Sequence, residues 1–196
     1  MEGLKQEKDK IAPTECRSEC GFKVGELTII SVVSGSEAYR ELCELVLSEG
    51  VDKGKTVCTY VFSKKEDSIV MDWICKRANV SVYRAEAGIL SHIEYVTLQL
   101  AKNELKKSEI YCSDNEMLIP VDILAQCRNM EPKNGAVDII FIESLSLRKQ
   151  FKADREVLEA NIGALKRIAK ELNVAIVTFA LFGKKEAKRL SGEVTE

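Results

Sequence analysis

Residues 153–180 read ADREVLEANIGALKRIAKELNVAIVTFA, an amphipathic stretch followed by a nearly continuous apolar run. In the first part, apolar side chains recur at spacings of three and four, at Leu158, Ile162, Leu165, Ala169 and Leu172. This spacing predicts a helix with one buried face. The second part, from 174 to 180, is typical of a strand that is buried on both faces of a parallel sheet.

The same alternation of strand and helix extends toward the N-terminus. Strands are predicted at Leu27–Val33, Thr56–Phe62, Val80–Tyr83, Ile110–Cys112, Val137–Ile142 and Val174–Ala180. Helices are predicted at Glu37–Ser48, Lys65–Ala78, Ser91–Lys107, Val121–Met130 and Ala153–Leu172. This order predicts an α/β fold of three layers, with a mainly parallel central sheet and right-handed crossovers.

The composition is that of one globular domain. The chain has 196 residues, of which 45% are hydrophobic and 31% are charged, and its formal net charge is −2. No apolar run approaches the roughly 20 residues that span a bilayer, and no secretory signal is evident, so the expected location is the cytoplasm. The charge balance favours no overall attraction to nucleic acid. The polar residues 1–21 are expected to form a flexible extension.

Seven cysteines are spread over predicted strands and helices. An odd number without regular spacing argues against a secreted disulfide framework and favours reduced, mostly buried thiols. Cys16 and Cys20 form a C-x-x-x-C pair, but no second pair follows at the spacing of a zinc site, so no metal is expected.

A phosphate-binding α/β domain would have its nucleotide site after the first strand. There a Gly-rich turn exposes backbone N–H groups, and a G-K-[ST] sequence supplies a lysine and a hydroxyl. Here the strand runs into residues 34–39, which read SGSEAY. No lysine follows a glycine, and Glu37 brings a carboxylate where phosphate would bind. A plain strand-to-helix turn is predicted, with Ser34 and Ser36 available to cap the helix.

Several motifs, in order and at sensible spacing, resemble one family. They are GELTII at 25–30, YVFS at 60–63, RAEAGILSHIEY at 84–95, IYCSD at 110–114, VDIIFIESLSL at 137–147 and LKRIAKELNVAIV at 165–177. Together they resemble the C-terminal, RecA-like motor domain of DnaB-type replicative helicases, in a degenerate and truncated form. The resemblance implies a fold of the P-loop NTPase type over residues 22–190, followed by a tail at 191–196.

The resemblance also implies where the ATP chemistry of that family would lie. An ungapped continuation of the first motif puts Val32 at the first small residue of the phosphate loop, Glu37 at its second glycine, Ala38 at its lysine and Tyr39 at its Ser/Thr; Ser34, Gly35 and Ser36 lie between. Lys65 falls on the catalytic glutamate, with Glu66 beside it, Glu143 on the metal-binding aspartate, and Leu181 on the sensor glutamine. We therefore expect no catalytic residue, no bound nucleotide cofactor and no ATPase activity.

The interpretation that follows is a non-catalytic domain that acts by binding in DNA replication or recombination, with a second copy of itself, a replicative helicase or a primase as partner. One alternative is a divergent nucleotide enzyme that uses Glu66, Glu143 and the turn from Ser34 to Ser36. Another is a single-stranded-DNA-binding module that uses Arg148, Lys149 and Lys152 around an aromatic side chain.

Overall fold

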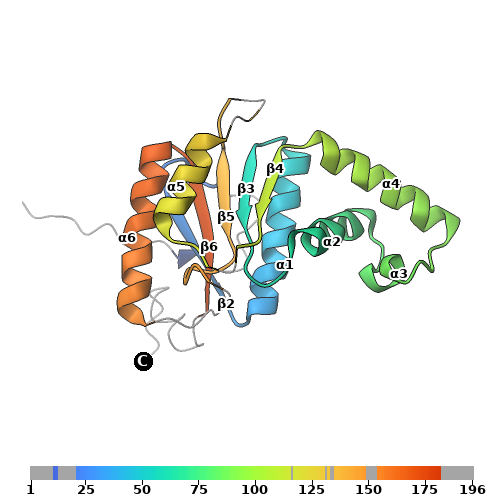
Figure 1. Ribbon diagram of the computed structural model, residues 1–196, viewed down its shortest axis with the longest axis horizontal. Coiled ribbons are helices and arrows are strands. Elements are labelled where there is room, and N and C mark those ends of the chain that lie inside the picture. Colours follow the sequence, from blue (N-terminus) through green and yellow to red (C-terminus); the bar gives the residue numbers. More distant parts are fainter. Residues whose placement is uncertain are drawn as a thin grey trace, which may run out of the picture.

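A sheet of six strands, each parallel to its neighbours, forms the centre of the computed structural model, in the order β1-β2-β6-β5-β3-β4 (Figure 1). The structure describes residues 11–12, 21–115, 117–130, 132, 135–148 and 154–181. The strands are β1 (Ile11–Ala12), β2 (Leu27–Val32), β3 (Val57–Tyr60), β4 (Ile110–Ser113), β5 (Ile139–Ile142) and β6 (Ala175–Leu181). The helices are α1 (Gly35–Val46), the π-helical turn η1 (Leu47–Asp52), α2 (Glu66–Ala78), α3 (Val82–Glu86), α4 (His92–Lys107), α5 (Pro120–Asn129) and α6 (Arg155–Leu172).

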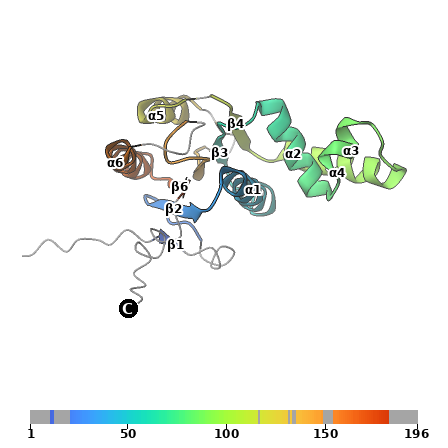
Figure 2. The same ribbon diagram turned by 90° about the horizontal axis from the view of Figure 1, so that it is seen from below.

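Helices cover both faces of this sheet (Figure 2). On one face, Ile140 of β5 belongs to the same apolar cluster as Leu165 of α6. On the other face, Phe141 of β5 belongs to a cluster with Leu42 of α1. Alternate residues of one strand therefore enter two separate cores, as expected for a parallel sheet buried on both sides. The predicted three-layer α/β architecture is confirmed.

The helix that precedes the last strand also forms as predicted. Leu165 and Ala169 of α6 are fully buried, and Leu158, Ile162 and Leu172 pack against the same cluster. The helix ends at Asn173, which adopts a left-handed conformation with φ 54°. Asparagine tolerates this backbone better than most residues, so it ends the helix and directs the chain into β6.

The predicted strand at Val80–Tyr83 is wrong, because this stretch leads into a short helix. Asn79 ends α2 in the left-handed conformation, and the N–H of Val80 donates to the carbonyl of Cys75 at 2.9 Å. Val80 is buried, but Tyr83 is 74% exposed. A β-branched residue placed directly after a helix cap fills the core without extending into a strand.

Two further differences concern the ends of predicted elements. The helix after β2 continues through η1 to Asp52, beyond the predicted end at Ser48. β1 lies within residues 1–21, which were expected to form a flexible extension. Its two residues pair with Ile29 and Ile30 of β2.

α3 and α4 form an arm, residues 82–107, that extends beyond β4 and away from the sheet in both views (Figure 1, Figure 2). Only Ala101 of the 16 residues of α4 is buried. Arg77 of α2 holds α4 in place, because it contacts Glu104 and Asp52 at 2.7 Å each. Among the helices that the structure describes, none combines the length and the apolar character needed to cross a membrane.

Glu49 of η1 provides a test of this fold at acid pH. Its carboxylate is buried and accepts hydrogen bonds from Lys53 at 2.6 Å and Lys55 at 2.5 Å. Burial alone would raise the pKa of Glu49, but the two lysines outweigh it, and the pKa is lowered. A carboxyl with a lowered pKa stabilises the fold above its unfolded pKa of about 4.3, and this stability is lost as the pH falls through the folded value.

We expect Glu49→Gln to lower the free energy of unfolding by about 1–2 kcal/mol at neutral pH. The difference from the wild type should shrink between about pH 5 and about pH 3. Urea titrations at several pH values measure both quantities. Glu44→Gln is the matched control: Glu44 forms an exposed pair with Lys76, and its loss should cost no more than about 0.5 kcal/mol. A constant difference across this pH range would contradict the assignment.

Candidate functional site

The carboxyl ends of the strands meet at one edge of the sheet, because all strands are parallel. Ligands of open α/β sheets bind outside this edge. The residues predicted to occupy the nucleotide-site positions lie at the ends of β2 and β6 and in the segments that follow β2, β3 and β5. This carboxyl edge is therefore the candidate site.

The turn after β2 is short. β2 ends at Val32 and α1 begins at Gly35, so two residues connect them. The hydroxyl of Ser34 accepts the N–H of Glu37 at 3.1 Å. The Glu37 carboxylate in turn accepts the N–H of Val33 at 2.7 Å. The chain's own side chains thus satisfy two N–H groups where a phosphate loop would present them to a ligand.

The side chains of Val32, before this turn, and Ala38, in the first turn of α1, face the interior. Val32 is 2% exposed and Ala38 is fully buried, and both belong to the cluster beneath α1. Ser36 is exposed, and its hydroxyl lies 3.0 Å from that of Ser34. The prediction that Ser34 caps the helix is confirmed. Ala38, which the resemblance places at the lysine of the phosphate loop, contributes to core packing.

Tyr39 joins α1 to α2 instead of presenting a small hydroxyl. Its hydroxyl donates to Asp72 of α2 at 2.6 Å. Lys64 donates to the same carboxylate oxygen at 2.5 Å and lies 4.7 Å from the centroid of the Tyr39 ring. Burial is the main cause that raises the pKa of Tyr39, and therefore the hydroxyl stays protonated and able to donate. A cation–π contact and two charge-assisted hydrogen bonds thus join Tyr39, Lys64 and Asp72 at this part of the edge.

Glu143, directly after β5, is fully buried. Its Oε2 accepts the N–H groups of Phe62 at 2.6 Å and Ser63 at 2.9 Å, which belong to the loop after β3. Its Oε1 has no hydrogen-bond partner among the described residues. The described part of the chain also contains no group of three or more His, Cys, Asp or Glu side chains placed to hold a metal ion. The carboxylate thus accepts hydrogen bonds from the backbone of the neighbouring loop.

Lys65 and Glu66 lie at the beginning of α2, beside the end of β4. Asp114 accepts the N–H of Glu66 at 3.2 Å, and its carboxylate lies 3.9 Å from the Lys65 ammonium. Lys65, which the resemblance places at the catalytic glutamate, is therefore paired with an aspartate that accepts an N–H of the first turn of α2. The Glu66 side chain is exposed.

The remaining predicted residues are only partly described. Leu181 ends β6 and pairs in register with Val32. Arg148 is half-buried, and its backbone forms an antiparallel bridge with Met117. Lys149 and Lys152 lie outside the described residues, so the DNA-binding prediction is untested.

Sequence reasoning missed three residues of this edge: Lys64, Asp72 and Asp114. Tyr39 and Asp72 are 33 positions apart, and no local pattern connects them. Asp72, an acidic residue among the apolar residues of α2, was the sequence signal for this contact, since a charge at a partly buried position requires a partner.

Seen together, these contacts do not fit a bound magnesium–nucleotide. Among the described residues, a phosphate group would meet the Glu37 carboxylate beside the position where a lysine is needed. The hydroxyl of Tyr39 and the Oε2 of Glu143 already have internal partners.

A second feature of functional interest lies on the arm. Its exposed large apolar side chains are Tyr83, Ile89, Ile93, Tyr95, Val96 and Leu100. Arg84 contacts Glu94 at 2.9 Å and the carbonyl of Ile89 at 3.1 Å, and these contacts hold the tip of the arm together. Large apolar side chains left exposed in this number often mark a protein interface.

The known proteins most informative for this chain are replicative helicases. It is 26% identical over 172 residues to the replicative DNA helicase DnaB of Haemophilus influenzae, a match that covers 84% of this chain and 36% of the relative. It is 24% identical over 167 residues to the DnaB of Buchnera aphidicola subsp. Acyrthosiphon pisum, with 82% and 36% covered. The chain thus spans little more than a third of the length of these curated relatives.

Solved structures agree on the fold. A solved ATPase domain matches with a TM-score of 0.73 at 18% identity, over 89% of this chain and 63% of that one. A DnaB-like replicative helicase, described with its interactions with primase, matches with a TM-score of 0.69 at 18% identity, over 84% and 42%. The profile of the DnaB-like helicase C terminal domain matches residues 17–191. Since this match covers most of the chain, the protein belongs to the DnaB-like helicase C-terminal domain family and has its RecA-like α/β fold.

Proposed function

We propose that this chain is a non-catalytic DnaB-like domain that acts by binding a DnaB-type helicase motor domain. The main support is the turn after β2, where Ser34 and Glu37 satisfy the backbone N–H groups that would otherwise face phosphate. Each lost charge-assisted contact costs a ligand about 1.5–3 kcal/mol. Losing the lysine and the glycine N–H groups of the phosphate loop together would remove most of the binding energy for a nucleoside triphosphate.

The arm supports the binding part of this proposal. Tyr83 and Ile93 are 74% and 75% exposed, while Arg77 fixes the base of α4 and Arg84 fixes its tip. A rigid arm needs little ordering on association, which lowers the entropic cost of binding. Exposed aromatic side chains are also the residues that most often dominate binding energy at interfaces.

The choice of partner draws on the family. A solved relative is a DnaB-like replicative helicase described with its interactions with primase. A RecA-like domain without nucleotide chemistry could occupy a place next to a motor domain and regulate the assembly in DNA replication or recombination. A second copy of this chain and a primase are the other partners that the experiments below distinguish.

The first prediction concerns nucleotide binding. We expect magnesium–ATP at about 1 mM to leave the melting temperature of the full chain unchanged, because a ligand stabilises only a fold that binds it. A nucleotide present at about 100 times its Kd would add about 2.7 kcal/mol. A saturable rise in melting temperature would support the divergent enzyme that uses Glu66, Glu143 and the Ser34–Ser36 turn. Repeating the titration on Glu37→Gln tests whether the carboxylate alone repels the ligand.

The second prediction concerns the role of Glu143. Glu143→Ala leaves the N–H groups of Phe62 and Ser63 buried without an acceptor, and should lower the free energy of unfolding by about 2–4 kcal/mol. Glu143→Gln keeps an acceptor oxygen and should cost about half as much. Chemical denaturation with and without Mg²⁺ measures both. Stabilisation of the wild type by Mg²⁺ that Glu143→Gln abolishes would instead make this carboxylate a metal ligand.

The third prediction concerns the arm. Replacing Tyr83, Ile93 and Leu100 by serine should change the free energy of unfolding by no more than about 0.5 kcal/mol per site, because all three are exposed. The same triple variant should lose co-purification with the DnaB-type helicase from the same organism. Ile119→Ser, an exposed apolar residue before α5, is the matched control and should bind normally.

Two outcomes would contradict this choice of partner. Light scattering that shows a self-oligomer disrupted by the triple variant would assign the arm to a second copy of the chain. Co-purification with primase but not with the helicase would assign it to primase. Binding to the helicase that the triple variant leaves intact would remove the arm from the proposal.

A further inference from the structure

The last strand of the sheet, β4, has one side of its backbone open. Among the described residues it pairs with β3 alone. The carbonyls of Glu109 and Ser113 accept N–H groups of the β3 segment at 2.8 and 3.0 Å. Backbone groups alternate in direction along a strand, so the N–H and C=O groups of Ile110 and Cys112 point away from β3. No described residue hydrogen-bonds to these four groups, which we call the β4 edge.

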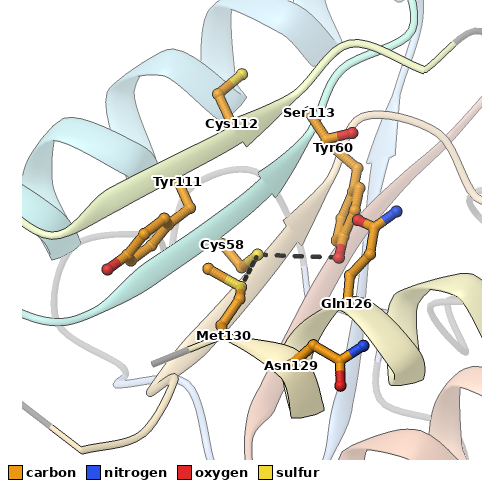
Figure 3. Close-up of a pocket in the computed structure, with 8 residues that line it drawn as sticks. All are labelled: Cys58, Tyr60, Tyr111, Cys112, Ser113, Gln126, Asn129 and Met130. Carbon is orange, nitrogen blue, oxygen red and sulfur yellow. Dashed lines mark hydrogen bonds between the residues drawn. The ribbon is translucent and has the colours of Figure 1, made fainter. Parts of the chain in front are cut away.

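A pocket lies beside the β4 edge, on the face of the sheet that α5 covers. Its volume is about 360 Å³, and three residues of β4 are in its wall, with Tyr60, Met130 and the amides of Gln126 and Asn129. Figure 3 shows Tyr111 of β4 on one side of the pocket and the two amides of α5 on the other. This volume is at the low end of the roughly 300–1,000 Å³ of small-molecule sites. It suits one large apolar side chain, and the rings and thioether of the wall favour an aromatic one.

Positive charge lies at one end of the β4 edge. Lys106 and Lys107, in the last turn of α4, are exposed just before β4. Neither forms an ion pair with another residue that the structure describes. At the other end, Asp114 already contacts the Lys65 ammonium and the N–H of Glu66. The charge that remains available to a partner is therefore that of the two lysines, which attract carboxylates.

An extended peptide matches these features better than a second copy of the chain. Two β4 strands could pair about a two-fold axis, and each would then satisfy the open groups of the other. The arm, however, extends beyond β4 in both views, so two sheets joined at this edge would have to share its space (Figure 1, Figure 2). A single added strand needs only about 4.8 Å beside β4.

We propose that β4 binds an extended segment of a partner protein by antiparallel strand addition. The backbone of the segment pairs with the β4 edge, and one aromatic side chain enters the pocket. This aromatic residue lies opposite Tyr111, because opposed residues of paired strands have side chains on the same face, and Tyr111 packs on the α5 side. Antiparallel pairing places the C-terminal end of the segment at the start of β4. Acidic residues therefore follow the aromatic one and face Lys106 and Lys107.

This site is separate from the exposed side chains of the arm, and it does not rest on the proposed function. It uses backbone hydrogen bonds for affinity and one pocket for specificity, which is the division of roles in strand addition generally. The partner is thus identified by its chemistry, as a protein with an extended segment in which acidic residues follow an aromatic one.

The probe is a synthetic peptide, acetyl-Thr-Val-Phe-Val-Thr-Glu-Glu-amide, titrated calorimetrically into the full chain at low salt. We expect saturable binding in the micromolar range. The N–H groups of the two valines face β4, so methylation of both nitrogens should weaken binding by about 10-fold or more. Methylation of the phenylalanine nitrogen, which points away from β4, is the matched control and should leave binding nearly unchanged. Alanine in place of phenylalanine should weaken binding by about 10-fold or more.

Variants of the chain test each feature of the site. Cys112→Pro removes only an N–H that faces away from β3, a change that edge strands tolerate, and it should abolish binding. Gln126→Trp fills the pocket and should abolish binding, whereas Ala125→Trp, at an exposed position of α5 outside the pocket, should not. Lys107→Glu should weaken binding at low salt, whereas Lys170→Glu, in the last turn of α6, should not.

The proposal is overturned if the peptide does not bind at about 1 mM, or if methylation of both valines leaves binding unchanged. Light scattering that shows a dimer of the chain, disrupted by Cys112→Pro, would assign the β4 edge to a second copy and would also overturn it. The methylated peptides decide the question even if Cys112→Pro does not fold, because they leave the chain unaltered.

Discussion

All strands of the sheet run in the same direction, and this single constraint determines where the rest of the molecule must lie. The central strands β5 and β6 require helices on both faces, since alternate side chains enter different cores. Their carboxyl ends meet at one edge, where the loops present backbone N–H groups that need acceptors. In this chain Glu37, Asp114 and Glu143 supply those acceptors from within. At these three positions, carboxylates of the chain itself accept the backbone N–H groups of the edge that binds ligands in related folds.

Much of this architecture could be predicted from periodicity. The apolar run at 139–142 and the stripe on α6 are local signals, and both formed as expected. The strand at Val80–Tyr83 failed because its β-branched residues follow a helix cap, where burial of Val80 alone satisfies the apolar signal. The contacts of Tyr39 with Asp72 and of Glu143 with the loop after β3 join segments far apart in sequence. Only the folded chain reveals such pairings.

The large apolar residues of the sheet are buried, whereas many of those on the arm are exposed. Strand residues such as Ile140 and Phe141 are fully buried and contribute to stability. Ile93 and Tyr95 are 75% and 54% exposed, so they contribute little burial to the stability of the isolated domain. Ion pairs of Arg77 and Arg84 hold this surface in a defined shape. The domain thus presents a shaped apolar surface outside its compact core.

Ala38 limits what a substitution at the start of α1 can do. Ala38, which the resemblance places where the phosphate-binding lysine would lie, is a fully buried residue of α1 in the apolar cluster between this helix and the sheet. A lysine introduced there would have to bury an ammonium group or unwind the first turn of the helix, and either change costs several kcal/mol. A lysine at this position would therefore require a different start of α1, beyond the change of one residue.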